Sequence, residues 1–241
     1  MILAAGRGER MRPLTDHTPK PLLPVGGKPL IVWHIERLVA AGLRHIVVNH
    51  AHLGEQIVAA LGDGSAWGAS IVYSAEPEGA WETAGGIRST LGDGAVDGPG
   101  AARPNLLSPD GEPFLVVNGD IWCDIDFGSL ALEQTSDLAQ LVLVPNPPQH
   151  PDGDFRLEGG RVRPKHGVAM AGAVAPALTF SGVGVYRPAL FAGTPPCRSS
   201  KLAPLLVAAM AEGCVGGCRF DGQWHDIGTP ERLAALDRKL H

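Results

Sequence analysis

Short apolar runs alternate with amphipathic helical patterns along the chain. In the segment 29–41, for example, Leu30, His34 and Leu38 recur on one side of a helix, and Gly42 ends the pattern. Such alternation is typical of right-handed βαβ units, whose strands pair in a parallel sheet. We therefore expect an α/β fold with a Rossmann-like, doubly wound and mostly parallel sheet. The expected strands are 45–49, 70–73, 114–118 and 140–144, and the expected helices are 29–41, 53–61 and 83–91.

Beyond residue 145 the pattern is richer in β signals. A hairpin is expected over 155–162, because two adjacent glycines fall at its centre. A strand at 178–186 and a helix at 201–212 are expected to follow. A final helix is expected to begin with Thr229 as its N-cap and Pro230 as its first residue. We expect a small β-rich subregion within a single domain that spans residues 1–241. Two segments without periodicity, 92–113 and 163–176, are expected to be surface loops.

Composition excludes several classes of protein. The 241 residues are 44% hydrophobic, which is enough for a sizeable core, although 32 glycines and 21 prolines predict many turns. A formal net charge of −5 argues against general binding of nucleic acid, which needs a basic surface. No apolar run has the length of a transmembrane helix, and no signal peptide precedes the first strand. We expect a cytoplasmic protein with reduced cysteines and no membrane partner.

A glycine-containing loop follows the first short strand. Gly6 and Gly8 would let backbone N–H groups approach phosphates closely, at the edge of a parallel sheet where ligands bind. The loop is no dinucleotide fingerprint, because Met11 stands where the third glycine is needed. The segment 26–28 is no Walker A loop either, since it lacks the upstream glycine and the following Ser or Thr.

The same loop concentrates positive charge in an acidic chain. Arg7, Arg10, Arg12 and Lys20 fall within it, and interspersed prolines reduce the entropy that ordering the loop would cost. Fixed positive charge beside close backbone amides suits a triphosphate. The alternative interpretation is a solvated basic loop without a ligand.

Two aspartates lie at predicted strand ends. Asp120 follows an apolar strand, and Asp226 precedes the capped final helix. Because Mg²⁺ prefers one or two carboxylates completed by water and phosphate oxygens, the pair could hold this ion. For Asp226 alone, the residues favour a role in turn formation or helix capping.

The motifs of the chain resemble those of a known enzyme family. The loop sequence at 3–15 and the run Pro-Lys-Pro-Leu-Leu-Pro-Val at 19–25 are similar to the signature of the sugar-phosphate nucleotidyltransferases, or nucleotide-sugar pyrophosphorylases. Later landmarks of the family recur in order at 118–120, 179–182 and 226–230, so the resemblance covers the whole chain. Within the family it is closest to the enzymes that uridylylate N-acetylmuramic acid 1-phosphate in cell-wall recycling.

The resemblance implies a division of the domain and a role for individual residues. Residues 1–125 would form the nucleotide-binding half and 126–241 the sugar and metal half. Arg10 and Lys20 would be catalytic, stabilising charge on the phosphates, while Asn118 and Asp154 would contact the sugar phosphate. Asp120 and Asp226 would be the Mg²⁺ ligands. The implied nucleotide contacts are Ala5, Gly6, Gly8, Glu9, Arg10, Lys20, Glu82 and Gly85.

The implied reaction joins two small-molecule substrates, a nucleoside triphosphate and a sugar 1-phosphate. UTP and N-acetylmuramic acid 1-phosphate are the expected pair. The alternatives are guanylylation of mannose 1-phosphate, uridylylation or thymidylylation of glucose 1-phosphate, and a nucleotide-sensing domain without activity. Arg156, Arg187 and Lys201 are candidates, by charge only, for binding the lactyl carboxylate of a muramic sugar. A monomer or weak dimer is expected, because the chain lacks the hexapeptide repeat of a β-helix tail.

Overall fold

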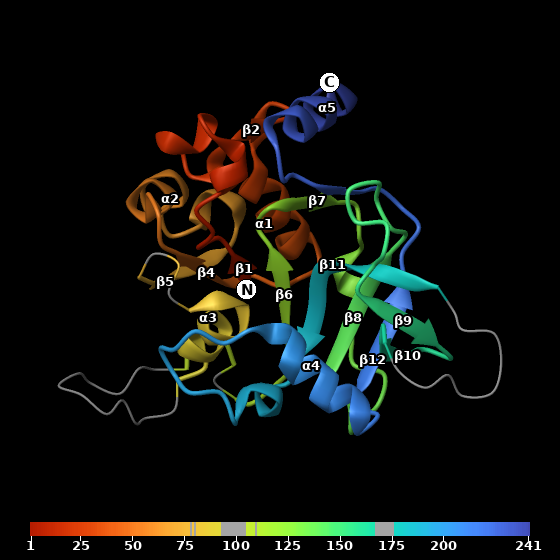
Figure 1. Cartoon of the computed structure of the whole chain (residues 1–241). Helices are drawn as coiled ribbons and strands as arrows, with labels where there is room; N and C mark the ends of the chain where they lie inside the picture. The colour runs from red at the N-terminus through yellow and green to blue at the C-terminus, as the bar shows by residue number, and fades with distance from the viewer. Residues whose placement is uncertain (78, 80, 93–104, 109, 167–175) are drawn as a thin grey trace.

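A single nine-stranded sheet runs through the centre of the protein. The computed structural model describes residues 1–241 except 78, 80, 93–104, 109 and 167–175 (Figure 1). In spatial order the strands are β5 (Ser70–Ala75), β4 (His45–His50), β1 (Ile2–Leu3), β6 (Phe114–Asn118), β11 (Ala177–Tyr186), β8 (Ala139–Val144), β12 (Val215–Arg219), β10 (Arg161–Pro164) and β9 (Phe155–Glu158).

The strands run mostly in one direction, as the sequence predicts. β5, β4, β1 and β6 pair in parallel, and so do β8 and β12. β11 is antiparallel to both β6 and β8, between which it lies, and β10 is antiparallel to β9 and β12. The antiparallel position of β11 is not evident from the sequence, because its apolar run resembles that of any buried strand. The predicted hairpin at 155–162 is confirmed as β9 and β10.

In the described ranges, four of five α-helices cover the sheet and the fifth, α5, packs on β2 and β13; all of the expected helices form, with ends that shift by one or two residues. Thr229 caps the last helix, accepting a hydrogen bond from the amide of Arg232, with Pro230 as first residue, as predicted. The helices are α1 (Leu30–Ala40), α2 (Gly54–Leu61), α3 (Glu82–Thr90), α4 (Leu202–Ala211) and α5 (Pro230–Leu240). Short 3-10 turns are η1 (Glu9–Met11), η2 (Leu14–Asp16), η3 (Lys20–Leu22), η4 (Ser65–Trp67), η5 (Phe127–Ser129) and η6 (Pro188–Phe191).

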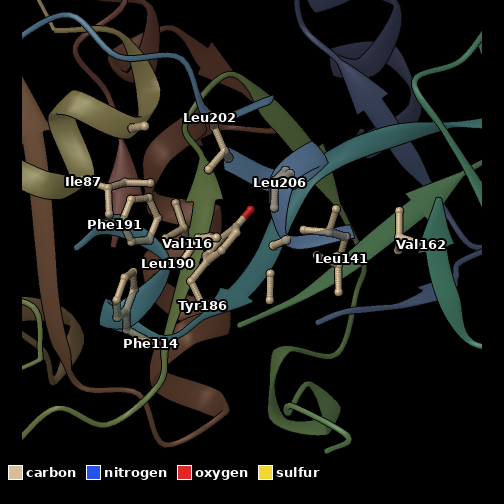
Figure 2. Close-up of a cluster of buried hydrophobic side chains, with 14 of the residues drawn as sticks. Ile87, Phe114, Val116, Leu141, Val162, Tyr186, Leu190, Phe191, Leu202 and Leu206 are labelled. Atoms are coloured by element: carbon tan, nitrogen blue, oxygen red, sulfur yellow. The ribbon is translucent and has the colours of Figure 1, made fainter. Parts of the chain in front are cut away.

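The two faces of the sheet carry separate hydrophobic cores. Successive residues of a strand point to opposite faces, so Val116 packs beneath α3 and α4 whereas Val117 packs beneath α1 and α2. Figure 2 shows the first core, where Tyr186 and Phe191 lie among the side chains of α3 and α4. Apolar cover on both faces explains why the central strands are continuous hydrophobic runs.

A third, smaller core joins the N-terminal loop to the C-terminal helix. Met11 and Val25 pack with Leu233 and Leu236 of α5, and Figure 1 shows α5 beside β2 (Pro24–Val25). The strand β2 pairs with β3 (Lys28–Pro29). A second two-stranded sheet pairs β7 (Ile121–Cys123) with β13 (Trp224–Asp226). The loop with the basic residues is therefore held by elements from both ends of the chain.

Much of the two segments expected to be surface loops lies outside the described residues. In the described part of 92–113, Leu106 and Leu107 pack against the core of Figure 2, so that portion is not loose. The four cysteines are all free thiols, as expected. Within the described ranges, no helix is long and apolar enough to cross a membrane. The division of a single domain into halves near residue 125 stays a prediction.

Candidate functional site

A cavity of about 710 Å³ opens where β1, β4 and β6 end. Leu3, Asn49 and Asn118 line it from the carboxyl ends of these three parallel strands, the edge at which α/β sheets bind ligands. The structure brings nine of the residues expected to act into this cavity. They are Ala5, Gly6, Gly8, Glu9, Arg10, Lys20, Glu82, Asn118 and Asp120.

The loop after β1 is folded into tight turns rather than extended. The carbonyl oxygen of Gly8 accepts hydrogen bonds from the amide of Met11 and from the Thr15 hydroxyl, both at 2.8 Å. Met11 is fully buried in the core beneath α5, so it fixes the centre of the loop. The backbone from Ala5 to Arg10 thus lines the cavity on a firm support, which favours the predicted role in holding phosphates.

The two residues predicted to be catalytic have contrasting surroundings. Lys20 is only 6% exposed, and its Nζ lies 2.9 Å from Oδ2 of Asp120. Arg10 is exposed at the mouth of the cavity, and no hydrogen bond or ion pair holds its guanidinium within the part of the chain that the structure describes. Lys20 is therefore a fixed charge, whereas Arg10 can reorient toward an incoming anion.

The two predicted metal ligands lie on neighbouring segments. Asp120 and Asp226 flank the β7–β13 pair, and the amide of Ile227 donates to the carbonyl of Asp120 at 3.0 Å. Each carboxylate uses Oδ2 in an ion pair, Asp120 with Lys20 and Asp226 with Arg232. In the described ranges, no hydrogen bond or ion pair uses either Oδ1.

The donor set suits Mg²⁺ without being a closed metal cage. No group of three or more His, Cys, Asp or Glu side chains forms a metal cluster among the residues that the structure describes. Mg²⁺ needs only one or two carboxylates when substrate phosphates and water complete its octahedron. Asp120 and Asp226 lie on paired backbone segments, each with one carboxylate oxygen left over, so their chemistry fits that requirement; Asp120 lines the cavity, whereas Asp226 is not among its lining residues.

The predicted nucleotide residues of α3 are placed differently from one another. Glu82 begins the helix with a φ of +55° and lines the cavity together with Trp81 and Thr83. Gly85 is buried and is not among the lining residues; its amide donates to the carbonyl of Ser200 at 3.2 Å. The structure thus brings Glu82, but not Gly85, to the cavity wall, and a nucleotide role for Gly85 stays a prediction.

Of the two residues predicted to bind the sugar phosphate, one lines the cavity and the other does not. Asn118 lines the cavity, and its amide packs against Gly182 of β11, where a Cβ atom would come within 2.7 Å of Nδ2. Asp154 is not among the lining residues. Its Oδ2 accepts a hydrogen bond from the amide of Phe180 at 2.8 Å, and its Oδ1 lies 3.0 Å from Nε2 of His150. The Asp154 carboxylate therefore joins the turn before β9 to β11 in this structure, and its contact with substrate stays a prediction.

Among the lining residues that the sequence interpretation did not name are two polar ones from neighbouring strands. Asn49 and Glu76 reach the cavity from the ends of β4 and β5, and burial raises the pKa of Glu76. A signal for Asn49 was present, because it closes an apolar run in the same way as Asn118. No comparable signal marks Glu76, which follows a strand of mixed character.

Comparison with known proteins identifies close relatives of the whole chain. A family model described as nucleotidyl transferase matches residues 1–155. An N-acetylmuramate alpha-1-phosphate uridylyltransferase of Neisseria meningitidis is 52% identical over 239 residues, covering 97% of this chain and 94% of the relative. Another protein of that name, from Caulobacter vibrioides, is 35% identical over 252 residues, covering 100% and 96%. A mannose-1-phosphate guanylyltransferase catalytic subunit beta of Danio rerio is 28% identical, covering 96% of this chain and 61% of that protein.

Solved structures share the fold at low sequence identity. HddC of Yersinia pseudotuberculosis superposes with a TM-score of 0.72 at 18% identity, covering 100% of this chain and 98% of that chain. The CTP:phosphocholine cytidylyltransferase LicC of Streptococcus pneumoniae gives 0.67 at 18% identity, covering 100% and 97%. The predicted α/β fold class is confirmed by these likenesses and by the sheet order.

Proposed function

Because the chain belongs to the nucleotidyl transferase family, we propose that it transfers a uridylyl group from UTP to N-acetyl-α-muramic acid 1-phosphate. The products would be the UDP-sugar and pyrophosphate, formed in the recycling of peptidoglycan. The observation that carries the choice of substrate is the 52% identity to the Neisseria meningitidis enzyme, which extends over nearly the full length of both chains. The site supports the reaction class, because its cavity combines a loop of backbone amides with the fixed charge of Lys20.

In this reaction an oxygen of the sugar phosphate attacks the α-phosphorus of UTP in line, and pyrophosphate leaves. The attacking phosphate is ionised at neutral pH, so no protein nucleophile or general base is required. Two polyanions must be brought together, and positioning and charge neutralisation therefore dominate the catalysis. The loop from Ala5 to Arg10 would hold the triphosphate through its amides.

Arg10 and Lys20 divide the neutralisation of charge between them. Lys20, which is buried, would contact the attacking phosphate and the α-phosphate. Its hydrogen bond to Asp120 holds the ammonium group in place before substrate binds. Arg10, exposed and free to reorient in the described structure, would close on the β- and γ-phosphates as pyrophosphate forms.

Asp120 and Asp226 would hold Mg²⁺. When bound, the ion would supply further neutralisation of the phosphates and a template for their alignment. The ion pairs with Lys20 and Arg232 balance the charge of both carboxylates and restrict their rotation. We further propose a cytoplasmic monomer or weak dimer that uses small-molecule substrates and binds neither nucleic acid nor membrane.

Pyrophosphate release over a panel of substrates tests this function. The purified protein is given UTP, GTP, CTP or dTTP with N-acetylmuramic acid 1-phosphate, glucose 1-phosphate or mannose 1-phosphate, in the presence of Mg²⁺. We expect UTP with the muramic sugar to give the highest kcat/KM. Equal or faster turnover of GTP with mannose 1-phosphate would favour the activity named for the Danio rerio relative. No turnover of any pair would support a nucleotide-sensing role instead.

A further inference from the structure

Three neighbouring strands end in one row beside the cavity. Leu3 of β1 is in register with Asn49 of β4 on one side and with Asn118 of β6 on the other. After Leu3 the chain leaves the sheet to form the loop from Ala5 to Arg10, called here the phosphate-facing loop. The amide of Ala4 therefore has no strand to pair with. The side chain of Asn49 takes that place, because its Oδ1 accepts the hydrogen bond from the Ala4 amide at 2.8 Å.

The other end of the same side chain contacts a second segment that lines the cavity. Nδ2 of Asn49 donates to Oε1 of Glu76 at 2.7 Å. Glu76 continues the pairing of β4 with β5, its amide donating to the carbonyl of His50 at 2.8 Å, and it lines the cavity with Pro77. Asn49, at 3% exposed, has both polar atoms of its amide satisfied inside the protein.

Helix α3 packs directly on this contact. A Cβ atom at Gly86 would lie 2.7 Å from Oε1 of Glu76 and 3.1 Å from Nδ2 of Asn49. The absence of a side chain at Gly86 therefore allows α3 to approach, and the first turn of the same helix brings Glu82 and Thr83 to the cavity. The side-chain amide of Asn49 thus hydrogen-bonds to the start of the phosphate-facing loop and to the segment after β5, and α3 packs against it.

We propose that Asn49 is a positioning residue for the nucleotide. It sets the start of the phosphate-facing loop at a fixed distance from the segment at Glu76 and Pro77, so that the triphosphate and the base are bound together. This inference rests on the proposed function, since it takes the nucleotide to lie between these two segments. The sugar phosphate would be held on the other side of β1, near Asn118, and should be affected little.

A reversible pair of substitutions tests the role. Asn49→Asp keeps the acceptor for the Ala4 amide but sets a carboxylate against Glu76. Glu76→Gln keeps an acceptor for Asn49 and serves as the reference. In the double variant the side-chain amide of the glutamine can donate to the new aspartate. The hydrogen bond between positions 49 and 76 is thereby restored, with donor and acceptor exchanged.

We expect Asn49→Asp to raise KM for UTP by roughly 10-fold or more, with KM for the sugar phosphate changed less than about 2-fold. The double variant should return KM for UTP to within about 3-fold of Glu76→Gln. Gly86→Ala, which crowds the contact without removing a hydrogen-bonding group, should raise KM for UTP in the same selective way. Gln56→Glu is the matched control, since it makes the same amide-to-acid change on the exposed side of α2, and it should behave as wild type.

Two results would overturn the proposal. One is an equal rise in KM for both substrates in Asn49→Asp. The other is a double variant no better than Asn49→Asp alone, because a role in folding alone predicts no selective rescue. If the wild type turns over no substrate pair, the proposed function fails, and calorimetric binding of UTP to wild type and Asn49→Asp then decides the role of Asn49 separately. Equal affinities in that measurement would refute it.

Discussion

The ammonium group of Lys20 lies 2.9 Å from Oδ2 of Asp120, joining the loop after the first strand to a strand end 100 residues further along the chain. The side chain of Lys20 is 8% exposed, whereas that of Asp120 is 44% exposed. The charge of Lys20 is thus oriented by a partner that itself faces the cavity. A substrate phosphate and a metal ion could each bind beside this pair without first ordering a flexible lysine, whose rotamer entropy has already been lost on folding.

Lys20→Met should therefore impair catalysis far more than folding. The methionine keeps the apolar stem in its buried position but removes the charge, and we expect kcat/KM to fall by roughly 10²- to 10³-fold. Steady-state pyrophosphate release measures the first effect and urea unfolding the second. A variant with wild-type kcat/KM would contradict a catalytic role for Lys20.

The metal assignment predicts that the two members of one ion pair differ in their effect on Mg²⁺ binding. Asp226→Asn should weaken Mg²⁺ binding by roughly 10-fold or more, because one anionic ligand is lost. Arg232→Met should leave it unchanged or strengthen it, because the carboxylate of Asp226 loses a competing cation. Calorimetric titration of Mg²⁺ into the UTP complex separates these outcomes. Activity that survives complete chelation of divalent ions would contradict the assignment.

Asp154 offers a test between a structural and a substrate role. Asp154→Ala leaves the partly buried amide of Phe180 without its charged acceptor, so we expect the free energy of unfolding to fall by about 1–3 kcal/mol. Asp154→Asn retains an acceptor oxygen and should fold normally. If Asp154 contacts the sugar phosphate as predicted, the asparagine variant will still raise KM for that substrate; unchanged kinetics would leave only the structural role.

His34 predicts a dependence of stability on pH. Its pKa is lowered from 6.5 to about 4, chiefly by burial, while its Nε2 lies 2.8 Å from the carbonyl oxygen of Ile121. The unfolded chain therefore takes up a proton between pH 6.5 and pH 4 that the folded protein does not, and stability contributed by the neutral ring is lost as pH falls through this range.

Urea unfolding at pH 7 and pH 5 measures this loss. Wild type should lose about 2 kcal/mol more of its unfolding free energy between these conditions than His34→Gln, whose side chain does not titrate. Other titrating groups contribute equally to both proteins and cancel in the comparison. Parallel pH profiles for the two proteins would show that His34 titrates alike in the folded and unfolded chains.

The elements of the fold were predictable because local patterns specify them. Apolar runs flanked by helical periodicity located β4, β6 and β8, and the threonine and proline at 229 and 230 located the start of α5. The antiparallel pairing of β11 was not predictable in this way. It depends on which strands meet across large sequence distances, and a buried strand has a similar sequence in either direction.

Part of the candidate site was also predictable, because local sequence motifs mark the loop that follows the first strand. Motif residues of the loop reached the cavity, since the loop follows a strand whose edge is the binding edge. The position of Asn49 at a strand end could have indicated it, but its hydrogen bonds to Ala4 and to Glu76 join residues far apart in the sequence and were not predictable. The ion pair of Lys20 and Asp120 is likewise a tertiary contact that no local spacing encodes.

The pairing register of Asn49, Leu3 and Asn118 fixes the distance between the two asparagines across the site. Adjacent strands are spaced about 4.8 Å apart by their hydrogen bonds, so the two asparagines stand about 10 Å apart across β1. That separation is a property of backbone pairing, which side-chain substitution cannot lengthen or shorten. Relatives that accept other sugars or bases would therefore have to diverge in the loops around this edge, while the span between the two sides of the active site stays constant.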